Sequence, residues 1–219
     1  MSNLRVTGQR LAPAEQSPAG VGNYDLYPAF PVASGAVGKG FDSLAEQLAG
    51  HRCIRIDGFV GVAWEQFQEQ LQTALRRLRI EPTWIAVARA EKDASEIADL
   101  VGPFLDNGDP VFGIRFAGQL KDFFDPEKLT ALKPDSGAEM TILYGCGAGL
   151  VDWDGPLVYV DLPKNELQYR SRAGMVRNLG TTATHSPQAQ YKRFYFVDWP
   201  VLSGHKADIV NRVDWFVDG

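Results

Sequence analysis

The chain lacks the residue patterns that metal sites and disulfide-bonded domains need. It has 219 residues but only two cysteines and three histidines, and His51, His185 and His205 are scattered along it. No Cys-x-x-Cys or His-x-His pair occurs, so the spacing predicts no metal site. Cys53 and Cys146 lie in apolar stretches, which favours buried free thiols over a disulfide.

Long apolar runs and basic clusters are missing too. No apolar run approaches the roughly 20 residues that span a bilayer. The first residues, MSNLRVTGQRLAPAEQ, lack the apolar core of a secretory signal. The net charge is −5, and no stripe of lysine and arginine offers a face to nucleic acid. We therefore predict a cytoplasmic protein with no membrane or nucleic-acid partner.

The remaining composition is that of an ordinary globular domain. Hydrophobic residues make up 45% of the chain and charged residues 22%, enough for one core of about 200 residues. Residues 1–23 are rich in Ala, Pro, Gly and Ser and predict a flexible N-terminal arm. Residues 24–219 are predicted to form a single α/β domain, with 24–50 packed on it as an N-terminal extension.

From Cys53 onward, apolar strands alternate with amphipathic helices. The strands read as continuous apolar runs, which is typical of a parallel sheet covered on both faces. We therefore predict a three-layer α/β/α fold with a mostly parallel sheet. Strands are expected at 53–59, 83–90, 155–163, 192–199 and 214–219, with a strand-like piece at 109–116 and a strand running into a glycine loop at 140–150. Helices are expected at 41–50, 64–78, 94–105 (ended by Gly102-Pro103), 120–132, 164–175 and 205–213.

The stretch CIRIDGFVGVAWEQFQEQLQTALRRL, residues 53–78, has the layout of a phosphate-binding loop: a strand, a glycine turn and a helix. Counted from Gly58, the positions of Gly-Lys-Ser/Thr hold Ala63, Trp64 and Glu65. In a working loop the lysine contacts the phosphates and the hydroxyl holds magnesium. Trp64 can do neither, and Glu65 puts negative charge where the phosphate would sit. Either the phosphate contacts have been lost, or this is a tight turn with Trp64 in the core.

Two stretches together resemble a known family. The strand, turn and helix around Gly58–Gly61 are similar to the first β-loop-α of the uridine kinase and phosphoribulokinase-like branch of P-loop kinases. The stretch ILYGCGAGLVDWDGPLVYVDLPKNELQYRSRAG, followed by YKRFYFVDWPVL, resembles the amino-terminal kinase-like region of some bacterial class I mannose-6-phosphate isomerase homologues. The resemblance covers most of residues 24–219. It implies a P-loop-kinase-like fold and a cupin isomerase domain, absent from this chain, as a partner.

The same resemblance implies a lid of arginines. Arg170, Arg172 and Arg177 match the region that closes over phosphates in these kinases, and a guanidinium can grip two phosphate oxygens at once. The alternative is a solvated helix face that pairs with Glu166.

Asp57 and Asp161 lie near the ends of expected strands and are candidates for a general base or a magnesium-water ligand. As carboxylates at strand ends they could equally cap the next turns. Ligands of parallel sheets bind at the carboxyl ends of strands. The other predicted phosphate- or ligand-binding residues are Gly58, Gly61, Val62, Arg115, Gly145, Gly147 and Lys192; for Lys192 an exposed position on an edge strand is the alternative.

Three functions stay open. The first is a degenerate, non-catalytic kinase-like domain of carbohydrate metabolism that binds a sugar phosphate or nucleotide, or scaffolds a mannose-6-phosphate isomerase domain. The second is an active sugar or nucleoside kinase that uses ATP and magnesium, with Arg170, Arg172 and Lys192 replacing the loop contacts. The third is a purely structural interaction domain. No metal ion is predicted, and no cofactor outside the kinase alternative.

Overall fold

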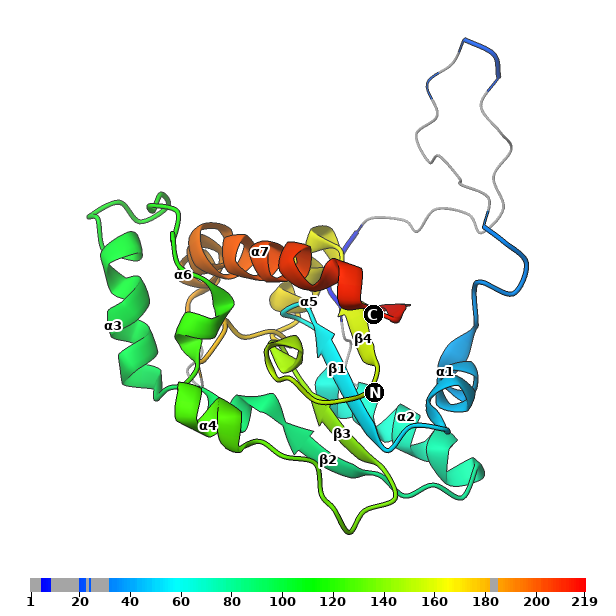
Figure 1. Cartoon of the computed structure of the whole chain (residues 1–219). Coiled ribbons are helices and arrows are strands. Elements are labelled where there is room, and N and C mark those ends of the chain that lie inside the picture. Colours follow the sequence, from blue (N-terminus) through cyan, green and yellow to red (C-terminus); the bar gives the residue numbers. More distant parts are fainter. Residues whose placement is uncertain (1–4, 9–19, 23, 25–31, 182–184) are drawn as a thin grey trace.

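Five strands form one parallel sheet at the centre of the molecule (Figure 1). The computed structural model describes residues 5–8, 20–22, 24, 32–181 and 185–219. The strands are β1 (Cys53–Gly58), β2 (Thr83–Ala86), β3 (Thr141–Tyr144), β4 (Leu157–Asp161) and β5 (Trp215–Asp218), in the order β2-β3-β1-β4-β5. All four pairings are parallel, and Ile56 of β1 lies opposite Tyr144 of β3 and Val158 of β4.

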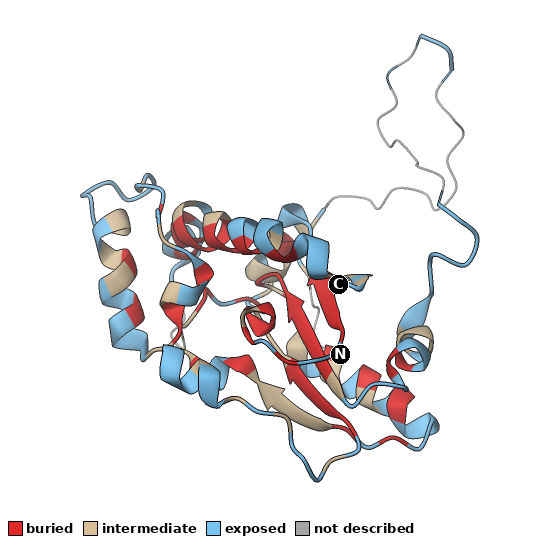
Figure 2. Ribbon diagram, in the orientation of Figure 1, coloured by how far each residue is buried: buried red, intermediate tan, exposed pale blue. Residues whose placement is uncertain are grey.

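Helices α1 (Gly40–Leu48) and α2 (Trp64–Arg77) cover one face of the sheet. The apolar positions of α2 recur at spacings of three and four, so one stripe of the helix meets the sheet. Phe67, Leu71 and Leu75 of that stripe pack in one cluster with Ile54 and Ile56 of β1. Figure 2 shows buried positions on α2 and on the strands beside it.

The opposite face is covered by α7 (Trp199–Ile209), with α3 (Ala94–Leu105) and α5 (Lys164–Arg172) in the same layer of packing. Successive side chains of a strand point to opposite faces. In β4, Val158 and Val160 therefore face α1 and α2, whereas Leu157 and Tyr159 pack against Ile209 of α7. The predicted three-layer α/β/α architecture with a parallel sheet is confirmed.

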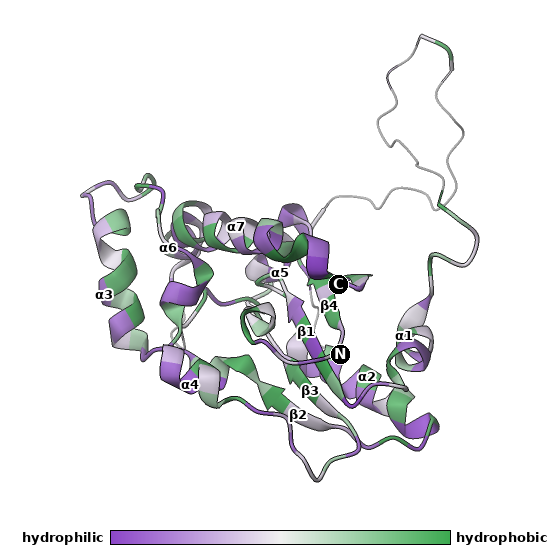
Figure 3. Ribbon diagram, viewed as in Figure 1, coloured by the Kyte–Doolittle hydropathy of each residue, from purple (hydrophilic) through white to green (hydrophobic). Residues whose placement is uncertain are grey.

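The central strand carries two charged residues on its α7 side. Ile54 and Ile56 point toward α2, and Arg55 and Asp57 alternate with them toward α7. Both charged side chains are buried, and Figure 3 shows hydrophilic positions on β1 within the hydrophobic sheet. Because a buried charge is costly unless it is compensated, these two residues must have specific partners.

The connections between strands contain several short elements. α4 (Pro126–Ala131) begins at Pro126 and is capped by Asp125, whose side chain accepts from the amides of Glu127 and Lys128. The single-turn helices are η1 (Val87–Ala90), η2 (Leu120–Phe123), η3 (Ala148–Leu150) and η5 (Val210–Arg212). The predicted strand at 83–90 is therefore only half strand, since it turns into η1 after Ala86.

Two predicted strands are wrong. Residues 109–116 form a loop, whose Ile114 and Phe116 amides donate to the carbonyls of Phe104 and Phe196. Residues 192–199 lie in helix: α6 (Pro187–Arg193) leads into the π-helix η4 (Phe194–Asp198) and on to α7. The aromatic composition of this stretch suits a strand, but tertiary packing overrides it, because the rings of Phe194 and Trp199 stack within the helical layer.

Other boundaries differ less. α3 does not end at Gly102-Pro103 but contains Pro103 and runs to Leu105. α1 begins at Gly40 instead of Phe41 and packs on α2, with the rings of Phe41 and Phe67 5.2 Å apart. The predicted arm, residues 1–23, lies largely outside the described residues, as does 25–31 of the predicted extension. No helix in the described part of the chain is long and apolar enough to cross a membrane.

A buried polar network joins η4 to the segment that follows α5. Asp198 is fully buried and its Oδ2 accepts from Asn178 Nδ2 at 2.6 Å. The Arg193 guanidinium donates to the carbonyl of Leu179 at 2.6 Å and lies 3.6 Å from Asp198 Oδ1. Burial raises the pKa of Asp198 to about 6, against the opposing effects of Arg193 and Asn178. The native fold therefore binds a proton at Asp198 more tightly than the unfolded chain does.

This difference predicts a pH dependence of stability. A pKa raised in the folded state contributes stability that is complete below the unfolded value, near 4, and is lost as the pH rises through about 6. Relative to Asp198→Asn, the wild type should lose up to about 3 kcal/mol of unfolding free energy between pH 4 and 7. Urea unfolding at several pH values measures this. Asp99→Asn, at an exposed position of α3, is the control, and a difference between wild type and Asp198→Asn that stays constant with pH would contradict the prediction.

Candidate functional site

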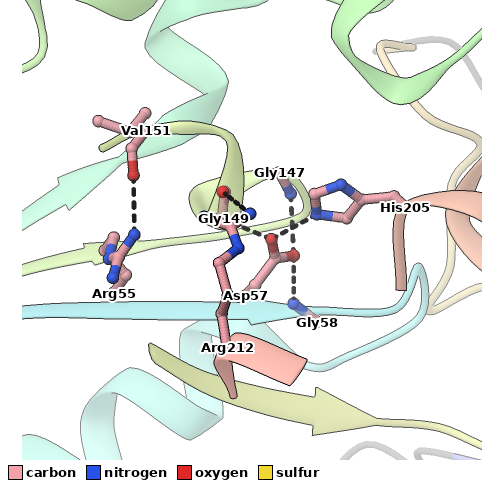
Figure 4. A network of polar contacts seen from close by, with 8 residues as sticks. All are labelled: Arg55, Asp57, Gly58, Gly147, Gly149, Val151, His205 and Arg212. Carbon is pink, nitrogen blue, oxygen red and sulfur yellow. Dashed lines mark hydrogen bonds and ion pairs between the residues drawn. The ribbon is translucent and has the colours of Figure 1, made fainter. Parts of the chain in front are cut away.

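The Asp57 carboxylate at the end of β1 is surrounded by four donors (Figure 4). Its Oδ1 accepts from the amides of Gly58 at 2.6 Å and Gly147 at 3.0 Å. Its Oδ2 accepts from the amide of Gly149 at 2.7 Å and from Nε2 of His205 at 2.7 Å. An ionised carboxylate only accepts hydrogen bonds, so Nε2 of His205 carries the hydrogen. This set of donors compensates a charge that has no contact with solvent.

The glycine loop after β3 is shaped to receive this carboxylate. Gly145 and Gly147 have φ angles of 118° and 100°, which only glycine adopts without strain. A Cβ added at Gly149 would lie 2.9 Å from Asp57 Oδ2, so a side chain there would push the carboxylate away. Successive backbone amides in such a turn form an anion-binding concavity. Here the anion that fills it is Asp57.

Arg55, the second charged residue of β1, holds the part of the β3–β4 connection that follows the glycine loop. Arg55 donates to the carbonyl of Val151 at 3.1 Å and to that of Gly155 at 2.9 Å. Burial lowers the pKa of Arg55, as does the nearby charge of Arg212. Arg212 of η5 donates to the carbonyl of Gly149 at 3.4 Å. The connection from β3 to β4 is thus tied to the central strand at several points.

The turn between β1 and α2 is closed by its own side chains. Phe59, Val60 and Val62 are all buried. The Phe59 amide donates to Val160 of β4 and the Val62 amide to Phe59, so neither is free for a ligand. Gly61 has a φ of 96° and packs so closely that an added Cβ would lie 2.6 Å from Leu167.

The two residues that replace Lys and Ser/Thr behave differently from one another. Trp64 is half-buried and packs at a tilt against Tyr144, with ring centroids 5.9 Å apart. Glu65 is exposed and makes no hydrogen bond to the turn within the described chain. The geometry therefore fits a tight strand–helix turn with Trp64 against the core, and Glu65 does not occupy the amides.

Arg170 and Lys192, which were predicted to bind phosphate, do not gather where a ligand of this turn would lie. Arg170 donates to the carbonyl of Gly61 at 3.0 Å and to that of Gly219 at 3.1 Å, and also pairs with Glu166. Lys192 is buried and donates to the carbonyls of Leu105 and Asp109 in the loop after α3. Its alternative placement on an exposed edge strand is wrong, because it lies in α6.

The other predicted site residues lie apart from Asp57. Arg115, Arg172 and Arg177 are exposed, and Arg172 lies over the ring of Tyr169 at 5.9 Å. Asp161 is at the end of β4 and pairs with Lys206, both side chains being partly exposed. The structure thus brings together Asp57, Gly58, Gly145 and Gly147, and separately Gly61 with Arg170. The roles predicted for these residues stay predictions.

His205 is the residue that the sequence analysis missed. It lines a cleft of about 580 Å³ between α7, η2 and the loop after β3, which we call the α7 cleft. A lone histidine in a helix carries no signal of its own, and Asp57 lies 148 positions away. The polar side chains that line the α7 cleft are Gln119, Lys121, Asp152, His205, Asp208 and Arg212.

Metal and thiol chemistry have little support in this region. No group of three or more His, Cys, Asp or Glu side chains within the described ranges could hold a metal ion. Cys146 of the glycine loop and Cys53 are free thiols, and both residues are partly buried where full burial was predicted. Burial raises the pKa of Cys146 and the charge of Asp57 raises it further, so the thiol stays protonated and is a poor nucleophile.

Comparison with known proteins gives a family and a fold. A family model described as a domain of unknown function (DUF8485) matches residues 40–219. No curated protein matches the chain. The crystal structure of a candidate fructose transport system kinase from Silicibacter sp. TM1040 is similar over 82% of this chain and 99% of that chain, with 13% identity and a TM-score of 0.50. At this identity the likeness shows the fold alone, and it bears out the predicted kinase-like α/β fold.

The contacts of Asp57 predict a large effect of a small substitution. Asp57→Asn keeps the shape of the side chain but removes its charge and points an N–H at a backbone donor. We expect a loss of about 3 kcal/mol in unfolding free energy. Asp161→Asn changes the same residue type at the end of the neighbouring strand, where the carboxylate is 43% exposed, and should cost less than about 1 kcal/mol. Equal costs for the two variants in urea unfolding would show that the Asp57 contacts are unimportant.

Proposed function

The chain belongs to the family of domains of unknown function DUF8485, and from this premise we propose that it is a kinase-fold domain without phosphoryl transfer that binds a small phosphorylated sugar. The observation that carries the proposal is the closed turn between β1 and α2. A kinase loop holds phosphates with unoccupied amides, a lysine and a hydroxyl. In this chain the amides of Phe59 and Val62 are bonded within the protein, and Gly61 packs so closely on Leu167 that an added Cβ would lie 2.6 Å from it.

The carbonyl of Gly61 adds to this evidence. It accepts from Arg170 at 3.0 Å, so an arginine that the family resemblance assigns to phosphates is bound to the turn itself. Arg170 also contacts Glu166 and the carbonyl of Gly219. To reach a phosphate it would have to leave these partners, each worth about 1 kcal/mol or more. This argues against the alternative of an active kinase with rewired contacts.

The class of ligand rests on the sequence resemblance. The stretch from Ile142 to Gly174 resembles the kinase-like region of mannose-6-phosphate isomerase homologues, whose chemistry concerns sugar phosphates. A nucleotide would need the contacts of a phosphate loop, which this chain lacks. A sugar phosphate does not need that loop, so it is the ligand that we infer. The proposal therefore places the domain in carbohydrate metabolism, beside a cupin isomerase domain.

One feature favours scaffolding as a second candidate function. The loop after α3 exposes three apolar side chains within four residues: Val111, Phe112 and Ile114. Gly113 of the same loop packs against the ring of Phe196, whose neighbour Tyr195 is also exposed. Exposed apolar groups that gather in one place mark interaction surfaces more often than single ones do.

The scaffolding function predicts a direct interaction. A separately produced mannose-6-phosphate isomerase cupin domain should bind the wild-type chain in calorimetric titration. Phe112→Ser together with Ile114→Ser should weaken binding about tenfold or more, because anchors of this size carry much of an interface's free energy. Leu78→Ser, an exposed apolar position at the end of α2, is the matched control. Undiminished binding by the double variant would remove this loop from the interface.

The closed turn predicts that ATP is not a ligand, even when the missing residues are restored. The wild type should show no binding of magnesium-ATP at concentrations up to about 1 mM. The triple variant Ala63→Gly, Trp64→Lys and Glu65→Ser rebuilds the Gly-Lys-Ser pattern. It should also fail to bind, because the amides of Phe59 and Val62 are still bonded within the protein. Calorimetry and a coupled assay for ADP measure these outcomes.

Two results would contradict the proposal in different ways. ATP-dependent phosphorylation of a sugar or nucleoside by the wild type would show that phosphoryl transfer remains. ATP binding by the triple variant alone would show that the side chains, and not the closed turn, abolish nucleotide binding.

A further inference from the structure

We propose that the α7 cleft is the ligand site of this domain, and that it takes a small hydroxylated anion of the sugar-phosphate class with Nδ1 of His205 accepting from a ligand hydroxyl. The inference deepens the proposed function and rests on its binding part. The cleft lies at the carboxyl ends of β1 and β3, beside Gly149, and this edge of a parallel sheet is where ligands bind.

His205 is the group around which the site is built. Its side chain is almost entirely buried, only 3% exposed, yet it lines the cleft. Asp57 holds Nε2 at 2.7 Å, which fixes the ring and leaves Nδ1 as the nitrogen that can accept a hydrogen bond from a ligand. Nδ1 makes no hydrogen bond to any residue that the structure describes. Figure 4 shows that it points away from Asp57.

The charges around the cleft select the ligand. Lys121 and Arg212 are cationic, and Asp152 and Asp208 are anionic. Within the described ranges, the side chains of Lys121, Asp152 and Asp208 form no hydrogen bond or ion pair. A triphosphate would meet two carboxylates and be repelled. A phosphorylated sugar offers one anionic group to Lys121 and Arg212 and several hydroxyls to the carboxylates.

The remaining wall and the size agree with such a ligand. Leu120, Leu150, Val201 and Ile209 give the cleft an apolar side, on which the C–H face of a sugar ring can pack. The volume of about 580 Å³ lies within the roughly 300–1,000 Å³ of small-molecule sites. Arg212 is bonded to the carbonyl of Gly149, so one cation is held at the rim near His205.

Calorimetric titration tests the site with three probes: mannose 6-phosphate, mannose and inorganic phosphate. Mannose 6-phosphate should bind, and the other two should bind at least about tenfold more weakly because each lacks half of the contacts. Lys121→Gln and Asp208→Asn change exposed side chains without partners and should leave the fold intact. Each should weaken mannose 6-phosphate binding about tenfold, whereas the control Lys128→Gln, in α4, should change it less than about twofold.

The nitrogen resonances of the three histidines give a second readout that needs no variant. Mannose 6-phosphate should shift Nδ1 of His205, while His51 and His185 serve as internal references. The inference is overturned if Nδ1 of His205 does not respond, if both variants bind normally, or if inorganic phosphate binds as tightly as mannose 6-phosphate. In those cases the wild type still binds a sugar phosphate elsewhere or recognises phosphate alone. Absence of any mannose 6-phosphate binding would overturn the binding part of the proposed function as well. The ATP experiments test the closed turn separately.

Discussion

The fold depends on compensation of one buried charge, the Asp57 carboxylate at the end of the central strand β1. Leaving such a charge without partners costs several kcal/mol, so the chain must bring donors to it. Two of them come from the glycine loop after β3 and one from α7. Meeting this requirement fixes the path of the loop and the position of α7 over the sheet. The polar strand β1 therefore organises elements that are distant in the sequence.

The same carboxylate occupies the anion-binding concavity of the glycine loop after β3. In both glycine-rich loops at this edge of the sheet, several backbone groups are hydrogen-bonded from within the protein. Asp57 supplies the anion of the loop after β3, and the turn after β1 bonds to Val160 and Arg170. The kinase-like fold alone does not set the chemistry at this edge, since function depends on the site and not on the architecture.

Much of the fold was predictable because it follows from local patterns. The apolar run in β4 and the apolar positions Ile54 and Ile56 indicated the sheet, and the spacing of Phe67, Leu71 and Leu75 indicated the buried face of α2. The helix at 192–199 could not be predicted, because its aromatic residues favour strands and only packing on Trp199 decides otherwise. His205 could not be found either, since its role comes from a contact across 148 positions and its immediate neighbours give no pattern.

Asp57 both fills the glycine loop after β3 and contributes to the neighbouring α7 cleft. The charge that fills the glycine loop also orients His205, because the two oxygens of Asp57 divide their contacts between backbone amides and the imidazole. Gly149 is next to both, and its missing side chain leaves room for the carboxylate and for the cleft. Because the Asp57 carboxylate already fills the glycine loop, this loop has no place for an anionic ligand. At the same time Asp57 presents a histidine nitrogen to the neighbouring cleft, where hydroxyl groups can be recognised.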